Sequence, residues 1–121
     1  MTITLPITSS GANTWSGAQS YTSTVTVGSS GSALTQVRLY SQALTPANVA
    51  ANTSAEQAFT VTGVSTDDRV FVNKPSAQAG LGIVGARVSG TNSLAITFGN
   101  FTGSVITPTA AETYEIVTIR M

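Results

Sequence analysis

Few residues in this sequence carry side chains suited to chemistry. The chain of 121 residues has no cysteine and no histidine, so it lacks a thiolate nucleophile, the commonest general base and the commonest metal ligand. Five basic and five acidic residues balance to a net charge of zero. These features argue against most hydrolytic and metal-dependent mechanisms. We therefore expect no enzyme activity and no organic cofactor.

Three groups of polar residues come closest to a catalytic or metal-binding pattern. Asp67-Asp68-Arg69 contains the only adjacent acids, which could form part of a Ca²⁺ site, but a charged turn before a strand is the simpler interpretation. Lys74 and Ser76 have the residue types of a Ser–Lys nucleophile, although their polar context favours a solvated loop. Glu112 and Glu115 are three residues apart, so on a strand they face opposite ways and form no acid/base pair.

The segment Gly80–Gly85 matches the pattern G-x-G-x-x-G letter for letter. A dinucleotide-binding fingerprint also needs a strand before it, a helix after it, and an acid about 20 residues further on. Here residues 86–90 have the pattern of a strand and a turn, and the next acid is Glu112. We interpret the segment as a strand whose glycines allow another backbone or side chain to approach closely.

The composition bounds the class of protein and its partners. Hydrophobic residues make up 41% of the chain, enough for a core, whereas charged residues make up only 8%. A neutral chain offers no electrostatic attraction to nucleic acid or to an anionic membrane, and little repulsion between its own copies. No apolar run approaches the roughly 20 residues of a membrane helix. Residues 1–6 lack the features of a signal peptide, so we expect synthesis in the cytoplasm.

Charge divides the chain into two parts. Before Glu56 the only charged residue is Arg38, and this part is rich in Ser, Thr, Gly, Ala and Asn. We place a boundary near Ala50–Asn52, between an N-terminal segment (1–50) and a domain (51–121). The only helix-like stretch is 45–51, which fits either a single turn or an extended linker equally well.

Strand patterns recur along the chain between turns of Gly, Asn and Pro. The predicted strands cover residues 24–27, 35–40, 58–62, 69–73, 81–89, 94–98 and 114–119. This pattern predicts an all-β fold, a small antiparallel β-sandwich of jelly-roll type with an extended N-terminal segment that holds two or three strands. Ala95 and Thr97 are expected to face outward. We expect one core that buries Phe59, Val61, Val70, Val72, Val84, Val88, Leu94, Ile96 and Phe98.

Four aromatic residues are candidates for an interface with other subunits. Trp15 and Tyr21 stand in a segment of small residues, where they are either core anchors or docking anchors on a neighbouring chain. Tyr40 is a third anchor of the same segment. Tyr114 begins a final strand with apolar residues on both faces, as in a buried or interface strand. Residues 1–50 are too poor in large apolar residues to cover their own ordering entropy, roughly 1–2 kcal/mol per residue, so we expect many contacts with other chains.

Three stretches of the sequence resemble a known structural module. They are residues 49–63, 72–89 and 94–102, with Asn-Lys-Pro-Ser at 73–76 and Gly-Leu-Gly-Ile-Val-Gly-Ala-Arg-Val-Ser at 80–89 as the more specific strings. Together they resemble a small β-sandwich module of virion structural proteins in tailed bacteriophages. The resemblance covers about residues 49–121 and implies a non-enzymatic building block with no catalytic residues.

The resemblance implies a component of the virion, but it does not say where on the virion the module lies. The first expectation is a capsid decoration, or cement, protein that bridges subunits of the major capsid protein as a homo-oligomer, with a trimer favoured. The short, charge-poor chain suits repeated docking on one lattice. The alternative is a tail or head fibre module that recognises a host surface glycan.

Overall fold

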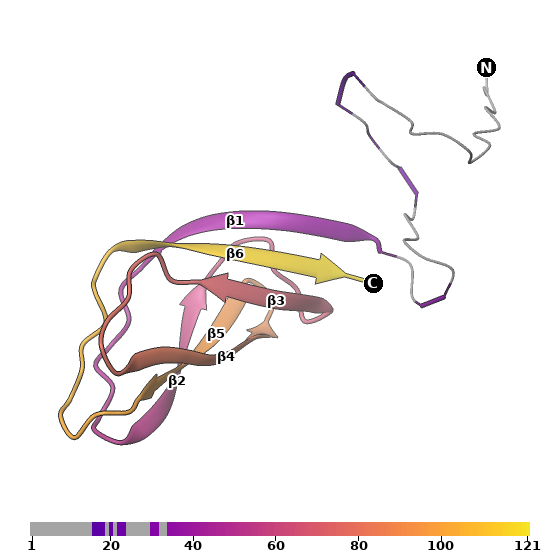
Figure 1. Cartoon of the computed structure of the whole chain (residues 1–121). Helices are drawn as coiled ribbons and strands as arrows, with labels where there is room; N and C mark the ends of the chain where they lie inside the picture. Colours follow the sequence, from indigo (N-terminus) through magenta and orange to yellow (C-terminus); the bar gives the residue numbers. More distant parts are fainter. Residues whose placement is uncertain (1–15, 19, 21, 24–29, 32–33) are drawn as a thin grey trace, which may run out of the picture.

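Strands are the regular secondary structure of the described part of the chain, and turns and loops connect them (Figure 1). The structure is a computed structural model, which describes residues 16–18, 20, 22–23, 30–31 and 34–121. Its strands are β1 (Gln36–Leu44), β2 (Thr53–Thr60), β3 (Asp68–Asn73), β4 (Leu81–Gly90), β5 (Ser93–Asn100) and β6 (Glu112–Arg120). No described residue is helical, so the all-β expectation is confirmed. Residues 45–50 are extended rather than a helical turn.

The six strands form two antiparallel sheets of three strands each. One sheet has the order β1-β6-β3 and the other has the order β2-β5-β4 (Figure 1). Of these strands, only β4 and β5 follow each other within one sheet, and the other connections cross between the sheets. The described residues therefore form a small β-sandwich, with fewer strands than a jelly roll.

The core lies between the two sheets. Its fully buried residues are Leu44, Val49, Val61, Val64, Leu94, Ile96, Phe98, Tyr114 and Ile116. Phe59, Val70, Val72 and Val88 are partly buried and pack against them. The alternation of β5 and β6 puts every second side chain into this layer, as the period of a strand requires. The predicted core is confirmed except for one residue, Val84.

Val84 points to solvent, with 60% of its surface exposed, where burial was expected. The register of β4 against β5 shifts between Ile83 and Gly85, which marks a β-bulge. An extra residue in one strand reverses the alternation beyond it. Ile83 and Ala86 therefore both pack against the core, and Val84 turns outward.

Ala95 lies on the outer face of β5, as expected, but it is buried there. Arg87 of β4 is paired with Ala95 in register, and Glu56 of β2 is paired with Thr97. The ion pair between Arg87 and Glu56, with 2.7 Å from Nη2 to Oε1, spans β5 on that face. Ala95 is covered by this bridge.

The expected boundary near Ala50–Asn52 does not divide the fold. β1 pairs with β6 along its whole length, from Gln36 opposite Arg120 to Leu44 opposite Glu112. Residues 36–50 thus belong to the sandwich, and Val49 exchanges two backbone hydrogen bonds with Ile106. The composition changes near residue 50, but strand pairing ignores that change. The predicted strand 24–27 lies outside the described residues.

Truncation should locate the true start of the sandwich. Deletion of residues 1–33 should leave a folded protein, because β1 begins at Gln36 and the buried core residues start at Leu44. Deletion of residues 1–50 should prevent folding, because it removes Leu44 and Val49, and each lost aliphatic side chain costs on the order of 2–5 kcal/mol. Far-ultraviolet circular dichroism with thermal unfolding distinguishes the two proteins. Cooperative unfolding of residues 51–121 at the temperature of the full chain would contradict this assignment.

Candidate functional site

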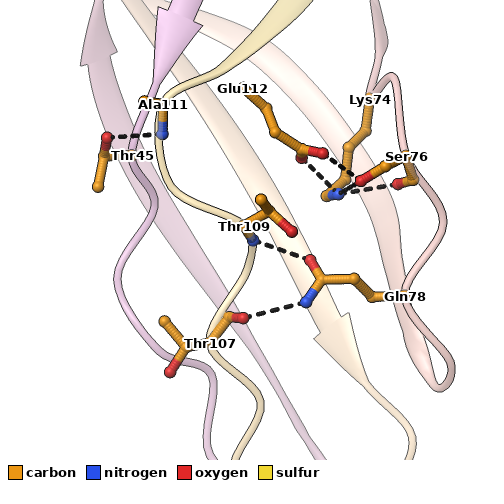
Figure 2. A network of polar contacts seen from close by, with 8 residues as sticks. All are labelled: Thr45, Lys74, Ser76, Gln78, Thr107, Thr109, Ala111 and Glu112. Atoms are coloured by element: carbon orange, nitrogen blue, oxygen red, sulfur yellow. Dashed lines mark hydrogen bonds and ion pairs between the residues drawn. The ribbon is translucent and has the colours of Figure 1, made fainter.

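Lys74, Ser76 and Glu112 form a polar cluster at one end of the sandwich (Figure 2). The ammonium of Lys74 lies 2.6 Å from Oε2 of Glu112 and donates to the carbonyl of Ser76 at 2.8 Å and to its hydroxyl at 3.0 Å. The hydroxyl of Ser76 donates to Oε1 of Glu112. The structure thus brings Glu112 to a pair of residues that precede it by 36 or more positions in the sequence.

This cluster is arranged as a structural link. A Ser–Lys nucleophile needs a lysine that accepts the serine proton. Here Lys74 donates to Ser76, and the proton of Ser76 is directed to Glu112. The hydrogen bonds from Lys74 and then Ser76 hold the pKa of Glu112 below its usual value. A low pKa keeps the carboxylate charged and paired with the lysine.

Two neighbouring contacts fasten the same end of the molecule (Figure 2). The side-chain amide of Gln78 accepts from the backbone nitrogen of Thr109 at 2.9 Å and donates to the carbonyl of Thr107 at 3.1 Å. The hydroxyl of Thr45 accepts from the backbone nitrogen of Ala111 at 3.1 Å. These bonds tie the connections before β2, before β4 and before β6 to one another.

Of the two adjacent acids, Asp68 is the one that forms an ion pair in the described structure, and this pair links β3 to β6. Its carboxylate accepts from Nε of Arg120 at 2.7 Å, from Nη2 at 3.0 Å, and from the backbone nitrogen of Ser65 at 2.9 Å. Hydrogen bonds from Arg120 first, and from Ser65, lower its pKa against the opposing effect of burial. The geometry is a charged turn at the start of β3. Within the described residues, no cluster of three acids suits a metal ion.

The structure assigns different positions to the four interface candidates. Tyr114 is fully buried in the core of its own chain, which excludes it from an interface. Tyr40 is partly buried and packs on the same core, with its ring against Gly63. Trp15 and Tyr21 lie outside the described residues.

The hydroxyl of Tyr114 has no hydrogen-bond partner in the described structure. Burial, with a smaller contribution from the charge of Glu112, raises its pKa to about 12. The residue therefore acts as a large apolar side chain that fills the sandwich. Sequence reasoning placed it on a strand with two apolar faces but could not say which face held the ring.

The outer face of the β1-β6-β3 sheet carries a contiguous block of apolar side chains, which we call the apolar face. Its members are Val37 and Leu39 of β1, Phe71 of β3, and Val117 and Ile119 of β6. Val37, Leu39 and Phe71 are 62%, 67% and 64% exposed. Leu39 and Phe71 are both paired with Val117, so the three lie in one row across the sheet. Blocks of this kind mark contact sites.

A second feature is a shallow groove on the other sheet, with a volume of about 630 Å³. It is lined by Asn52, Thr53, Ser54, Val84, Gly99, Asn100 and Phe101. Phe101 is 74% exposed. A Cβ on Gly99 would lie 2.7 Å from Val84 and 2.9 Å from Phe101, so only glycine lets these two side chains lie over the sheet. The groove has no charged residue in its lining.

The glycines of the 80–85 motif have separate roles in the structure. Gly80 has a φ of +77°, and a Cβ there would lie 2.1 Å from the methyl group of Thr102. Gly82 is in ordinary contact with Phe101, and Gly85 faces open space. The motif continues into β4 rather than into a helix. It lacks the strand–turn–helix setting of a dinucleotide site.

Comparison with known proteins adds no relatives. No family model matches the sequence, and no curated protein or solved structure matches it either. The described part of the chain offers no helix of a length and hydropathy that would span a bilayer.

We expect the stability of the sandwich to fall in acid. A carboxylate whose pKa is lowered by folding stabilises the protein above its unfolded pKa, and the contribution is lost as the pH falls through the folded pKa. The pKa of Asp68 lies below its usual 3.8, so its contribution is complete at neutral pH and is lost progressively below about pH 4, as the pH falls through the folded pKa. Asp68→Asn should lower the free energy of unfolding at pH 7 by about 1–3 kcal/mol and flatten the pH profile.

Urea unfolding between pH 3 and pH 7 measures both effects. Asp67→Asn is the matched control, because that exposed neighbour makes no side-chain ion pair in the described structure. It should retain the wild-type profile. Equal profiles for Asp68→Asn and wild type would show that the link to Arg120 contributes nothing.

Proposed function

We propose that the chain is a non-enzymatic assembly module of a tailed-bacteriophage virion, acting as a capsid decoration protein. The observation that carries the proposal is the apolar face, which leaves three large side chains about two-thirds exposed. Such a block suits a protein partner, since burial of apolar area is the main driving force of association. The phage setting is supported by the resemblance of residues 49–121 to virion modules.

Two further features favour a structural role. The polar clusters at Lys74 and Asp68 are used as links between strands and loops, with their donors and acceptors turned to one another. The chain is small, neutral and poor in charge, which suits a subunit whose surface is covered by neighbours. In this proposal the partners are the major capsid protein and further copies of the chain.

The copy number in purified virions tests the decoration role. We expect quantitative mass spectrometry to find the chain in a number that matches the capsid subunits, because a cement protein occupies every equivalent lattice site. A number that matches the tail symmetry would favour a fibre instead. Absence from purified virions would contradict both the decoration role and the fibre role.

Substitutions on the apolar face should impair binding to capsids that lack the chain. Leu39→Ser with Phe71→Ser should weaken co-sedimentation with such capsids at least about tenfold, because the assembly contact made by this face, with the capsid or with a further copy, is lost. Val84→Ser is the matched control, since it removes an equally exposed side chain from the other sheet. Equal losses for the control and the double variant would argue against the apolar face.

A second candidate function is recognition of a host glycan by a fibre module. The groove beside Phe101 favours it, because an exposed aromatic ring flanked by the polar residues 52–54 is suited to a neutral sugar. Sugar rings stack their C–H groups on aromatic faces and offer hydroxyls to amide and hydroxyl side chains. Asn100 makes the groove rigid, since its amide donates to the carbonyls of Val49 and Ser104.

Saturation-transfer NMR with neutral oligosaccharides tests this second candidate. Phe101→Ala should weaken binding by about tenfold, equivalent to about 1.4 kcal/mol. Phe71→Ala, which removes an exposed ring from the opposite sheet, should leave binding unchanged. Absence of any saturation transfer from the wild-type protein to the oligosaccharides would remove the glycan candidate and leave the decoration proposal intact.

A further inference from the structure

On the outer face of the β1-β6-β3 sheet, side chains from the three strands form rows across the sheet. A row with a negative charge and a row with a positive charge lie on opposite sides of an apolar row. Successive rows across the sheet are Ser41–Glu115–Asn73, Leu39–Val117–Phe71 and Val37–Ile119–Arg69. Glu115 lies in the first row and Arg69 in the third. The middle row is wholly apolar, and the apolar face fills most of the third row.

Glu115 and Arg69 make no ion pair within the described structure, whose ion pairs are Lys74–Glu112, Arg87–Glu56 and Arg120–Asp68. Among the described residues, the carboxylate of Glu115 accepts from the hydroxyl of Ser41, and Arg69 donates to the backbone carbonyl of Asp67 at 2.9 Å. Two rows of a strand separate them by roughly 13 Å. This distance is too long for a contact within one chain.

We propose that two copies of the chain pack apolar face against apolar face, about a two-fold axis that runs along the Leu39–Val117–Phe71 row. Rotation about this axis leaves the middle row facing itself and exchanges the two flanking rows. Glu115 of each copy then lies over the row that holds Arg69 of the other copy. The face is thus complementary to itself in apolarity and charge, as a two-fold contact requires.

The arrangement has the layout of a specific interface. Apolar side chains form its centre, and one pair of opposite charges lies on each side of the axis. Packed sheets lie about 10 Å apart, which an arginine side chain and a glutamate side chain can span together. Charges at the rim fix the register of the two sheets and exclude the parallel arrangement, in which like charges would meet.

This inference rests on the proposed function, since it takes the apolar face as an assembly surface and names a second copy as its occupant. A two-fold contact differs from the trimer expected from the sequence. A trimer would need a second contact surface elsewhere on the chain. The two-fold contact would then join trimers in pairs.

The test is a charge exchange in the full-length protein, followed by sedimentation equilibrium over a range of concentrations. Arg69→Glu and Glu115→Arg should each weaken self-association by roughly tenfold or more, because each places like charges opposite one another. The double variant should restore it, since opposite charges again face each other. The matched control exchanges Glu56 and Arg87 on the other sheet and should leave self-association unchanged.

A dimer, or an even multiple of three copies, with rescue in the double variant supports the inference. It is overturned by a monomer at all concentrations, which is the expected result if residues 1–33 or another protein covers the face. It is also overturned if single reversals have no effect or if the double variant fails to recover. Circular dichroism of each variant excludes misfolding as the cause.

The outcome is separable from that of the decoration proposal. A monomeric wild type that binds capsids removes the two-fold contact and leaves the proposed function standing. If charge exchange restores self-association but the chain is absent from virions, the two-fold contact stands and the decoration proposal fails.

Discussion

Strand β6 has buried or half-buried side chains on both of its faces, and the rest of the sandwich depends on this strand. Its inner face supplies Tyr114 and Ile116 to the core, and its outer face supplies Val117 and Ile119 to the apolar face. Because β1 and β3 pair with its two edges, β6 is the middle of its sheet. A middle strand that is apolar on both faces is typical of a sheet covered on both sides. The described residues cover only one side, and this uncovered side is the surface that we propose as a contact site.

Alternation in the sequence predicted the strands and most of their inward faces. Leu94, Ile96 and Phe98 repeat with the period of a strand, and all three are buried. Val84 could not be predicted in the same way, because a bulge arises from a register shift against β5. Pattern reasoning follows one strand at a time, whereas the bulge is a property of a pair. The outward turn of Val84 is also what forms one wall of the groove beside Phe101.

Because pattern reasoning does not show which strands pair, it also could not place β1 in the sandwich or assemble the polar clusters. The fall in charge before residue 56 describes composition, but Leu44 belongs to the core because β1 pairs with β6. Lys74 and Ser76 were visible as neighbours, but Glu112 joins them only through the crossing of the chain between sheets. The third member changes the chemistry, because it holds the lysine in an ion pair. The two-sided apolar pattern of residues 114–119 indicated an apolar outer face on the last strand. The pattern did not show which residues of β1 and β3 would lie beside it.

More than half of the few charged side chains are paired with one another in the described structure. Three ion pairs use six of the charged residues: one links the loop after β3 to β6, one links β3 to β6, and one spans β5. A free soluble protein instead places most of its charges on the surface, where they keep copies apart. Here three pairs of charges link strands and loops of the sandwich, and Arg69 and Glu115 lie beside the apolar face without an ion pair in the described structure. A chain with zero net charge and few charged residues has little electrostatic repulsion between its copies. This property agrees with the proposal that neighbouring subunits cover the side chains that its own strands leave exposed.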